Sequence, residues 1–231
     1  MMKVAILGHG RTGRVLEEMI EENEAMDIGT MEDGRFDVIV DFSHPDNLEK
    51  IKKYALEYSK PAVIATTGYT DSQVCSIKEM AETVPVVFSS NFSLGITVMQ
   101  RILSEITPLL KDSFDMEMIE KHHRGKLDAP SGTGKMLLKT MDPDGGYDVM
   151  YGRSGMGRRG REIGVHSLRC GSISGEHSVI YAGEDEILEI THKAGSNRIF
   201  TAGALKAAEF ALKQAPGLYS MQDVLFGGEK K

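Results

Sequence analysis

The chain has 231 residues, of which 41% are hydrophobic and 26% are charged, so it can bury a core sufficient for one or two domains. Its formal net charge of −7 disfavours nucleic acid as a partner, because phosphate backbones need a net basic face. No apolar run approaches the roughly 20 residues of a membrane span, and the first residues, MMKVAILGHG, show no small-residue cleavage site. We therefore expect a soluble cytoplasmic protein that binds no membrane.

The distribution of charged residues and the spacing of the cysteines indicate which kinds of ligand the chain can bind. Residues 121–169 hold ten Lys or Arg against five Asp or Glu, and a basic island in an acidic chain favours a small anionic ligand. Cys75 and Cys170 lie far apart and belong to no Cys-x-x-Cys or Cys/His cluster. We expect them to be buried free thiols, and we expect no metal site.

The first 90 residues or so alternate between strand and helix patterns. Strands are predicted at 2–7, 36–42, 61–65 and 84–88, while residues 25–28 give only a weak strand signal. Helices are predicted after residue 13, around residues 48–55, and after Thr70, where Gln73 completes a capping box. Parallel strands need such crossovers, so this region predicts a Rossmann-like doubly wound α/β domain with a parallel sheet.

The pattern changes after residue 93. A long amphipathic helix is predicted at 94–110, followed by two-residue alternation around 114–118, 165–170, 178–182 and 186–191. These segments predict a second, α+β domain with a mostly antiparallel or mixed sheet backed by helices. Residues 145–164 contain seven glycines and four arginines and predict a mobile loop. Residues 198–212 predict a last helix that could return to the first domain.

A glycine turn connects the first strand to the first helix. In the order G-x-G-x-x-G, Gly8 permits the tight turn, Gly10 lets a pyrophosphate approach the backbone, and Gly13 lets the helix pack closely. The free N–H groups at the helix start favour an anion. The acid that would bind the adenosine ribose is either Asp27 or Glu32, and the pattern leaves both open.

Three further segments follow the predicted strands, at 41–44, 65–68 and 89–92. Ligands of doubly wound sheets bind beyond the carboxyl ends of the strands, so these loops are candidates for the rest of a cofactor site.

Residues 120–134, EKHHRGKLDAPSGTG, carry the most chemistry. Two imidazoles, an ammonium and a guanidinium precede a helix start at Pro130-Ser131, where free N–H groups favour a carboxylate or phosphate. Histidine can exchange a proton near neutral pH, and Lys126 can donate a proton or hold a carboxylate. Adjacent histidines on an extended segment point to opposite sides and chelate metals poorly. The run also lacks the first glycine and the final Ser/Thr of a P-loop.

This run closely resembles the signature of the 4-hydroxy-tetrahydrodipicolinate reductase family, also called dihydrodipicolinate reductases. The resemblance covers nearly the whole chain, through VIVDFSHP, ATTG, SSNFSLG, YGR, EIGVHSLRCGSISGEH and ITHKAGSNRIFTAGALKAAEF. It implies reduction of a cyclic dicarboxylate imine by NADH or NADPH, in lysine and diaminopimelate synthesis. It also implies a homotetramer, a nucleotide domain at 1–92 plus 199–231, and a substrate-binding and oligomerisation domain at 93–198 with an open mixed sheet.

The resemblance assigns roles residue by residue. It makes His122 a catalytic proton donor and acceptor and Lys126 a catalytic proton donor. Substrate contacts fall on His123, Ser131, Gly132, Thr133 and Arg198. Cofactor contacts fall on Gly8, His9, Gly10, Arg11, Thr12, Gly13, Phe42, Ala65, Thr66, Thr67, Ser89, Ser90, Asn91 and Phe92.

The chain departs from the family pattern in three places. Its glycine turn is one residue shorter than the usual G-x-x-G-x-x-G, Ala65 replaces the first glycine of G-T-T-G, and the segment 21–34 is short. Two other functions are weighed: a dehydrogenase acting on a smaller monocarboxylate amino acid or imine, and a nucleotide sensor without catalysis. The sensor would show erosion of the histidine and lysine run, and none is present.

Overall fold

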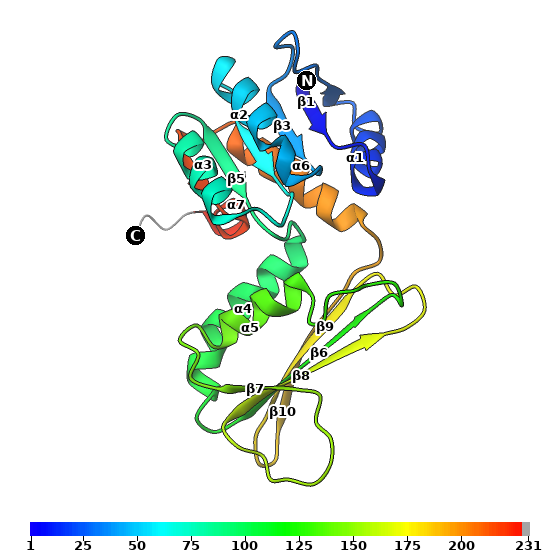
Figure 1. The fold of residues 1–231 in the computed structure, drawn as a ribbon, viewed down its shortest axis with the longest axis vertical. Helices are drawn as coiled ribbons and strands as arrows, with labels where there is room; N and C mark the ends of the chain where they lie inside the picture. Colours follow the sequence, from blue (N-terminus) through cyan, green and yellow to red (C-terminus); the bar gives the residue numbers. More distant parts are fainter. Residues whose placement is uncertain (228–231) are drawn as a thin grey trace. The chain divides into compact units, whose positions relative to one another are not determined.

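The computed structural model describes residues 1–227 and consists of two compact units (Figure 1). Unit 1 comprises residues 1–97 and the chain from Asn197 onward, and unit 2 comprises residues 98–196. The division falls inside helix α4 (Leu94–Leu110), whose bounds agree with the predicted helix.

Unit 1 is built on a six-stranded sheet in which every neighbouring pair is parallel. The strand order β11-β5-β4-β3-β1-β2 confirms the predicted doubly wound sheet. The strands are β1 (Met2–Leu7), β2 (Met26–Ile28), β3 (Val38–Asp41), β4 (Ala62–Ile64), β5 (Pro85–Phe88) and β11 (Gly217–Tyr219). The order reverses between β1 and β3, and this switch point is where such sheets bind ligands.

Helices cover both faces of this sheet, as the crossover rule requires. One hydrophobic cluster joins the sheet to α1 (Arg11–Glu21), α6 (Arg198–Ala211) and α7 (Met221–Phe226). The other cluster joins it to α2 (Leu48–Glu57), which the short 3₁₀ turn η1 (Pro45–Asn47) precedes, and to α3 (Asp71–Ala81). Both hydrogen bonds of the predicted Thr70–Gln73 capping box are present at the start of α3.

The end of the described chain departs from the sequence prediction. Helix α6 is not the last helix, because β11 and α7 follow it. Strand β11 has only three residues, Gly217–Tyr219, and pairs with β5 at the sheet edge. Three residues are too few to show two-residue alternation, so the sequence around β11 does not indicate a strand. The strand forms by pairing with β5, which is distant in sequence.

Unit 2 contains a five-stranded mixed sheet in the order β10-β9-β6-β8-β7. Neighbours β6, β8 and β7 are parallel, whereas β9 is antiparallel to both β6 and β10. The strands are β6 (Asp115–His122), β7 (Asp148–Tyr151), β8 (Glu162–Arg169), β9 (Glu176–Ala182) and β10 (Ile187–Lys193). In β6 every second residue from Met116 to His122 is buried, as the alternation predicts. Helices α4 and α5 (Gly132–Met141) back the sheet (Figure 1).

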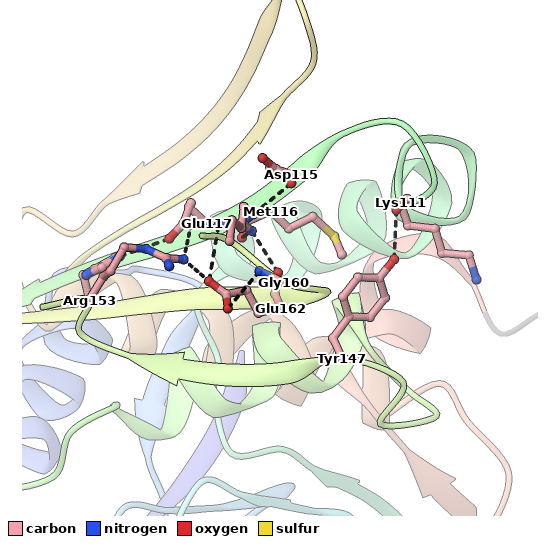
Figure 2. A network of polar contacts seen from close by, with 10 residues as sticks. Lys111, Asp115, Met116, Glu117, Tyr147, Arg153, Gly160 and Glu162 are labelled. Carbon is pink, nitrogen blue, oxygen red and sulfur yellow. Dashed lines mark hydrogen bonds and ion pairs between the residues drawn. The ribbon is translucent and has the colours of Figure 1, made fainter. Parts of the chain in front are cut away.

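The expectation of a loop over residues 145–164 is wrong in part. Residues 148–151 form β7, and β8 begins at Glu162. Ion pairs also tie the intervening segment to the sheet. Arg153 pairs with Glu162 (Figure 2), and Arg159 pairs with Glu117. The guanidinium of Arg159 also donates to the carbonyls of Met116 and Glu162, at 2.9 and 2.8 Å. The glycine-rich composition of this segment indicated a loop. The ion pairs that hold the segment could not be predicted, because their partners lie on other strands.

The sequence also predicted buried cysteines and no membrane-spanning segment. Cys75 and Cys170 are exposed, so the prediction of buried thiols is wrong, although both are free. Across residues 1–227, none of the helices combines the length and apolar character needed to cross a membrane.

Helix α6 packs closely against the loop after β5, and Gly203 makes this approach possible. A Cβ built at Gly203 would lie 1.7 Å from the carbonyl oxygen of Phe92. Alanine would favour the helix by roughly 1 kcal/mol, but overpacking against an immobile backbone costs about 1–3 kcal/mol. We therefore predict that Gly203→Ala lowers the urea midpoint of unfolding. Lys206→Ala, at an exposed site of the same helix, should change it little, and a gain in stability for Gly203→Ala would contradict this packing.

Candidate active site

The glycine turn lies at the switch point of the parallel sheet, between the ends of β1 and β3. Gly8 has φ +103°, and a Cβ there would lie 2.4 Å from the carbonyl oxygen of Phe42. A Cβ at Gly13 would lie 1.7 Å from the carbonyl oxygen of Gly8. The backbone therefore requires both glycines for its own packing.

Gly10 differs, because no atom lies within 4 Å of the Cβ position that it leaves empty. It is exposed and forms the N-cap of α1 without a side-chain capping bond. The free N–H groups of the first helical turn therefore adjoin open space, which suits the close approach of an anion. These observations fit the pyrophosphate of a dinucleotide.

Two cavities adjoin this turn. One, of about 500 Å³, is lined by Thr12, by Phe42 to Asp46, by Ala65 to Gly68, and by Thr70 and Gln73. The other, of about 190 Å³, is lined by Thr12, Phe42, Ala65, Ser90, Asn91, Phe92 and Phe200. Residues from all four predicted cofactor segments therefore meet here. Ser89 lines neither cavity, and its hydroxyl donates instead to the carbonyl of Asn91.

Asp41, the first residue of the candidate segment 41–44, is a buried carboxyl group that was not assigned a cofactor contact. It accepts hydrogen bonds from the backbone N–H of Ser43 at 3.0 Å and from the hydroxyl of Tyr69 at 3.3 Å. The Ser43 N–H also donates to the hydroxyl oxygen of Thr66 at 2.9 Å, so the loops after β3 and β4 are joined. Burial raises the pKa of Asp41, with the hydrogen bonds opposing this shift. Its position at the end of an apolar strand was the signal available in the sequence.

Both ribose candidates are exposed. The carboxylate of Asp27, within β2, accepts the N–H of Ile28. Glu32 follows β2 and pairs with Lys50 of α2 at 3.2 Å. Neither contact selects one of them for a ribose.

In unit 2, the predicted catalytic run begins at the end of β6. His122 is the last residue of that strand and only 8% exposed, whereas His123 is half-buried. A turn follows, closed by a bond from the Lys126 N–H to the His123 carbonyl at 3.1 Å. The ammonium of Lys126 pairs with Asp128 at 2.7 Å.

Helix α5 begins where the sequence predicted. Ser131 is its N-cap, and the hydroxyl of Ser131 accepts the Gly134 N–H at 3.0 Å. Gly132 and Thr133 occupy the first turn of this helix. A carboxylate placed there would also be stabilised by the helix dipole.

Three polar residues that were not predicted as site residues surround Ser131 and His122: Glu120 and His177, which are buried, and Arg169, which is partly buried. Glu120 of β6 is fully buried, and its carboxylate accepts from Arg169 of β8 at 2.7 Å and from the Ser131 N–H at 2.9 Å. His177 of β9 lies in T-shaped contact with His122, with ring centroids 5.2 Å apart. Glu120 could have been found from the sequence, because it is a glutamate on the buried face of a strand with two-residue alternation. Arg169 and His177 could not, because only strand pairing brings them to Glu120.

Burial and neighbouring charges keep Glu120 ionised and His122 neutral. Burial disfavours the carboxylate of Glu120, but hydrogen bonds from His177, Ser131 and Arg169 outweigh it and hold the pKa well below the usual range. Burial lowers the pKa of His122 to about 4, and positive charge on Lys126 and Arg169 adds to the effect, while Glu120 opposes it. Near neutral pH this site therefore contains a carboxylate beside a neutral imidazole.

Possible metal-ligand atoms of Glu120, His122 and His177 lie within 4.8 Å of one another. The Glu120 carboxylate already has Arg169 and the Ser131 N–H as partners. A divalent cation would add buried charge beside a guanidinium, which is costly. The expectation of no metal remains a prediction.

Arg198, the remaining predicted substrate residue, belongs to unit 1. It begins α6, and its guanidinium pairs with Glu22 at 2.7 Å. The other four predicted substrate residues all lie in unit 2.

Comparison with known proteins identifies the family. Residues 95–225 match the family model described as dihydrodipicolinate reductase, C-terminus, and residues 27–92 match the corresponding N-terminus. A protein of Brachyspira hyodysenteriae named 4-hydroxy-tetrahydrodipicolinate reductase is 43% identical, covering 97% of this chain and 100% of the relative. One of the same name from Exiguobacterium sibiricum is 38% identical, covering 96% of this chain and 95% of the relative.

A solved structure shares the fold. It is a dipicolinate-bound dihydrodipicolinate reductase from Paenisporosarcina sp. TG-14, with a TM-score of 0.81 at 22% identity, covering 97% of this chain and 100% of that one. The doubly wound sheet, the mixed sheet and the family matches across both units lead to one conclusion. This chain belongs to the dihydrodipicolinate reductase family, whose members are oxidoreductases.

Proposed function

We propose that this chain reduces 4-hydroxy-tetrahydrodipicolinate to tetrahydrodipicolinate, with NADH or NADPH as the hydride donor and with loss of the 4-hydroxyl group as water. The observation that carries the proposal is the catalytic segment itself. A buried imidazole at His122, the ammonium of Lys126 and the helix start at Ser131 lie within one segment between β6 and α5. They provide acid–base groups and a binding site for an anion, as reduction of a dicarboxylate imine requires.

The nucleotide is assigned to unit 1. The turn from Gly8 to Gly13 would hold the pyrophosphate, and the segments at Phe42, 65–67 and 89–92 would hold the nicotinamide half. A bound reduced nicotinamide supplies the hydride. The chain's own residues shape this site. The Ser43 N–H, which bonds both Asp41 and Thr66, joins two of these loops, and Gly10 leaves the approach to the helix start open.

The substrate is assigned to unit 2. One carboxylate would bind at the start of α5, beside Gly132 and Thr133, because the positive end of the helix dipole favours an anion there. A Cβ position at Gly132 has no atom within 4 Å, so the approach is open. His123 and, from unit 1, Arg198 are proposed as further substrate contacts.

Proton transfer is assigned to Lys126 and His122. The ammonium of Lys126 can donate a proton to the reduced ring as negative charge develops there. His122 is neutral before the substrate binds, given its lowered pKa. A dicarboxylate nearby would raise that pKa, so His122 can take up a proton and return it.

The first prediction concerns the reaction. Substrate formed freshly from pyruvate and aspartate semialdehyde should drive oxidation of NADH or NADPH, followed at 340 nm with each nucleotide in turn. Pyridine-2,6-dicarboxylate should inhibit competitively, because it presents two carboxylates on a flat ring. Indifference to this inhibitor, together with turnover of a monocarboxylate imine, would instead favour the smaller-substrate dehydrogenase.

The second prediction concerns catalytic roles. His122→Gln and Lys126→Ala should each lower kcat by about 10²- to 10⁴-fold, the usual contribution of general acid–base catalysis. The Kd for NADH, measured by fluorescence titration, should stay nearly unchanged. Lys121→Gln is the matched control, since Lys121 pairs with Glu176 on the other face of β6. Near-native rates in both catalytic variants would contradict the roles.

The third prediction separates the glycines of the turn. Gly10→Ala should fold normally, because its Cβ would meet no atom of the protein, yet weaken NADH binding at least about tenfold by blocking the pyrophosphate. Gly13→Ala should destabilise the fold itself. The two measurements are the thermal midpoint and the Kd for NADH, and unchanged binding in Gly10→Ala would argue against this nucleotide position.

The fourth prediction follows from the charge state of His122. Its ring signals in NMR should titrate near pH 4, and the His122→Gln spectrum identifies them. Since the unfolded imidazole binds a proton near pH 6.5, acidification favours the unfolded chain. The free energy of unfolding should therefore fall by roughly 3 kcal/mol from this group between pH 6.5 and pH 4, with the loss reduced in His122→Gln. A titration at pH 6.5 would contradict the burial argument.

A further inference from the structure

The ammonium of Lys126 already has an anionic partner within the chain. It forms an ion pair with Oδ1 of Asp128 at 2.7 Å. The Asp128 carboxylate also accepts the backbone N–H of Gly132, in the first turn of α5. These bonds hold the pKa of Asp128 below its usual value, with the bond from Lys126 as the largest cause. A carboxylate of the chain therefore binds both the proposed proton donor and the helix start.

Asp128 is not needed to cap this helix. Ser131 is the N-cap of α5, and its hydroxyl accepts the Gly134 N–H at 3.0 Å. The side chain of Asp128 is also 49% exposed, against 23% for its partner Lys126. An ion pair with a partner this exposed contributes little to the stability of a fold. Support of the fold therefore does not explain why a carboxylate stands beside the ammonium.

The carboxylate can leave the ammonium without movement of the main chain. Arg169 donates to the carbonyl oxygen of Asp128 at 2.5 Å and to the carboxylate of Glu120 at 2.7 Å, so the backbone at Asp128 is held to strands β6 and β8. Rotation about the Cα–Cβ bond to another staggered rotamer can turn the exposed carboxylate toward water. The ammonium of Lys126 and the N–H of Gly132 are then available to another anion.

We propose that Asp128 is a specificity-determining residue, an internal competitor that occupies Lys126 until a carboxylate of the substrate displaces it. The proposal rests on the proposed function, because it takes a dicarboxylate as the displacing ligand. A carboxylate on the same short turn acts at an effective concentration in the millimolar range or above. An anion with one carboxylate therefore displaces it poorly. A dicarboxylate has a second carboxylate for its other proposed contacts, His123 and Arg198, and can outcompete it.

Competition of this kind has a measurable sign. If the Asp128 carboxylate leaves Lys126 in only about a tenth of the molecules, the Kd of any anion that binds there is about tenfold higher than without the competitor. Removal of the charge on Asp128 should therefore strengthen binding. If Asp128 instead held the ammonium in its working position, removal of the charge would weaken binding.

The test measures binding of pyridine-2,6-dicarboxylate and of pyridine-2-carboxylate to the full chain by calorimetry, with NADH present. Asp128→Asn keeps the size of the side chain and removes its charge, so it should lower both Kd values by about three- to thirtyfold. Glu176→Gln is the matched control, because Glu176 also pairs with a lysine, Lys121, at 3.1 Å on the other face of β6. In this control both Kd values should stay within about twofold, since salt screens distant charges.

A double variant shows whether the gain depends on the ammonium. Lys126→Ala should weaken binding, and Asp128→Asn added to it should give little further gain, because the main group under competition is gone. In steady-state kinetics, Asp128→Asn should lower the KM for the substrate and leave kcat within a few-fold, because only a competitor of binding is removed. Asp128→Ala is a second variant for the same measurements, and thermal midpoints report whether each variant is folded.

The outcomes separate this proposal from the proposed function. Unchanged or higher Kd values in Asp128→Asn and Asp128→Ala would overturn the competitor role, as would an equal gain from Asp128→Asn with and without Lys126. In both cases the unmodified chain would still bind pyridine-2,6-dicarboxylate, and the proposed function would stand. If the unmodified chain bound NADH but neither pyridine carboxylate, the dicarboxylate function itself would fail, and the competitor role with it.

Discussion

The ion pair between Glu120 and Arg169 is the interaction on which the substrate side of the structure depends. It joins the neighbouring parallel strands β6 and β8, and through the Ser131 N–H it also fixes the start of α5. An unpaired charge at a fully buried position would cost several kcal/mol, so neither partner is dispensable alone. A hydrophobic pair could fill the same volume, but it could not orient the donors around Ser131. The two charges thus orient the neighbouring hydrogen-bonding groups more than they stabilise the fold.

The nucleotide side of the molecule depends on a different constraint, the close approach of backbone segments at the switch point of a parallel sheet. Gly8 and Gly13 serve the packing of β1, α1 and the loop after β3, whereas Gly10 leaves space open. Beyond the ends of the neighbouring strands, the Asp41 carboxylate accepts the N–H of Ser43 in its own loop, and that N–H also donates to Thr66 in the loop after β4. A rigid edge of this kind costs little to order when a ligand binds, which favours affinity.

Local patterns were sufficient to predict much of this architecture. The glycine turn, the capping box at Thr70 and the helix at 94–110 depend on neighbouring residues, and the structure has all three. Strands β7 and β11 were missed because they are short and are held by partners distant in sequence. The candidate site divides in the same way. The run from His122 to Thr133 is contiguous and could be named, whereas Arg169 and His177 reach Glu120 only through strand pairing.

Charge balance around the catalytic segment connects these features to the proposed reaction. Before substrate binds, Glu120 is balanced by Arg169 and Lys126 by Asp128, while His122 is neutral. The segment therefore has nearly compensated charge, although it lies in the basic part of the chain. A dicarboxylate bound as proposed would bring two negative charges, which the start of α5 and the ammonium of Lys126 would balance only in part. The remaining negative charge raises the proton affinity of His122, because an anion stabilises the imidazolium. In the proposed reaction, burial of His122 would thus tie proton uptake to arrival of the substrate, so the site would gain its proton when there is a ring to receive it.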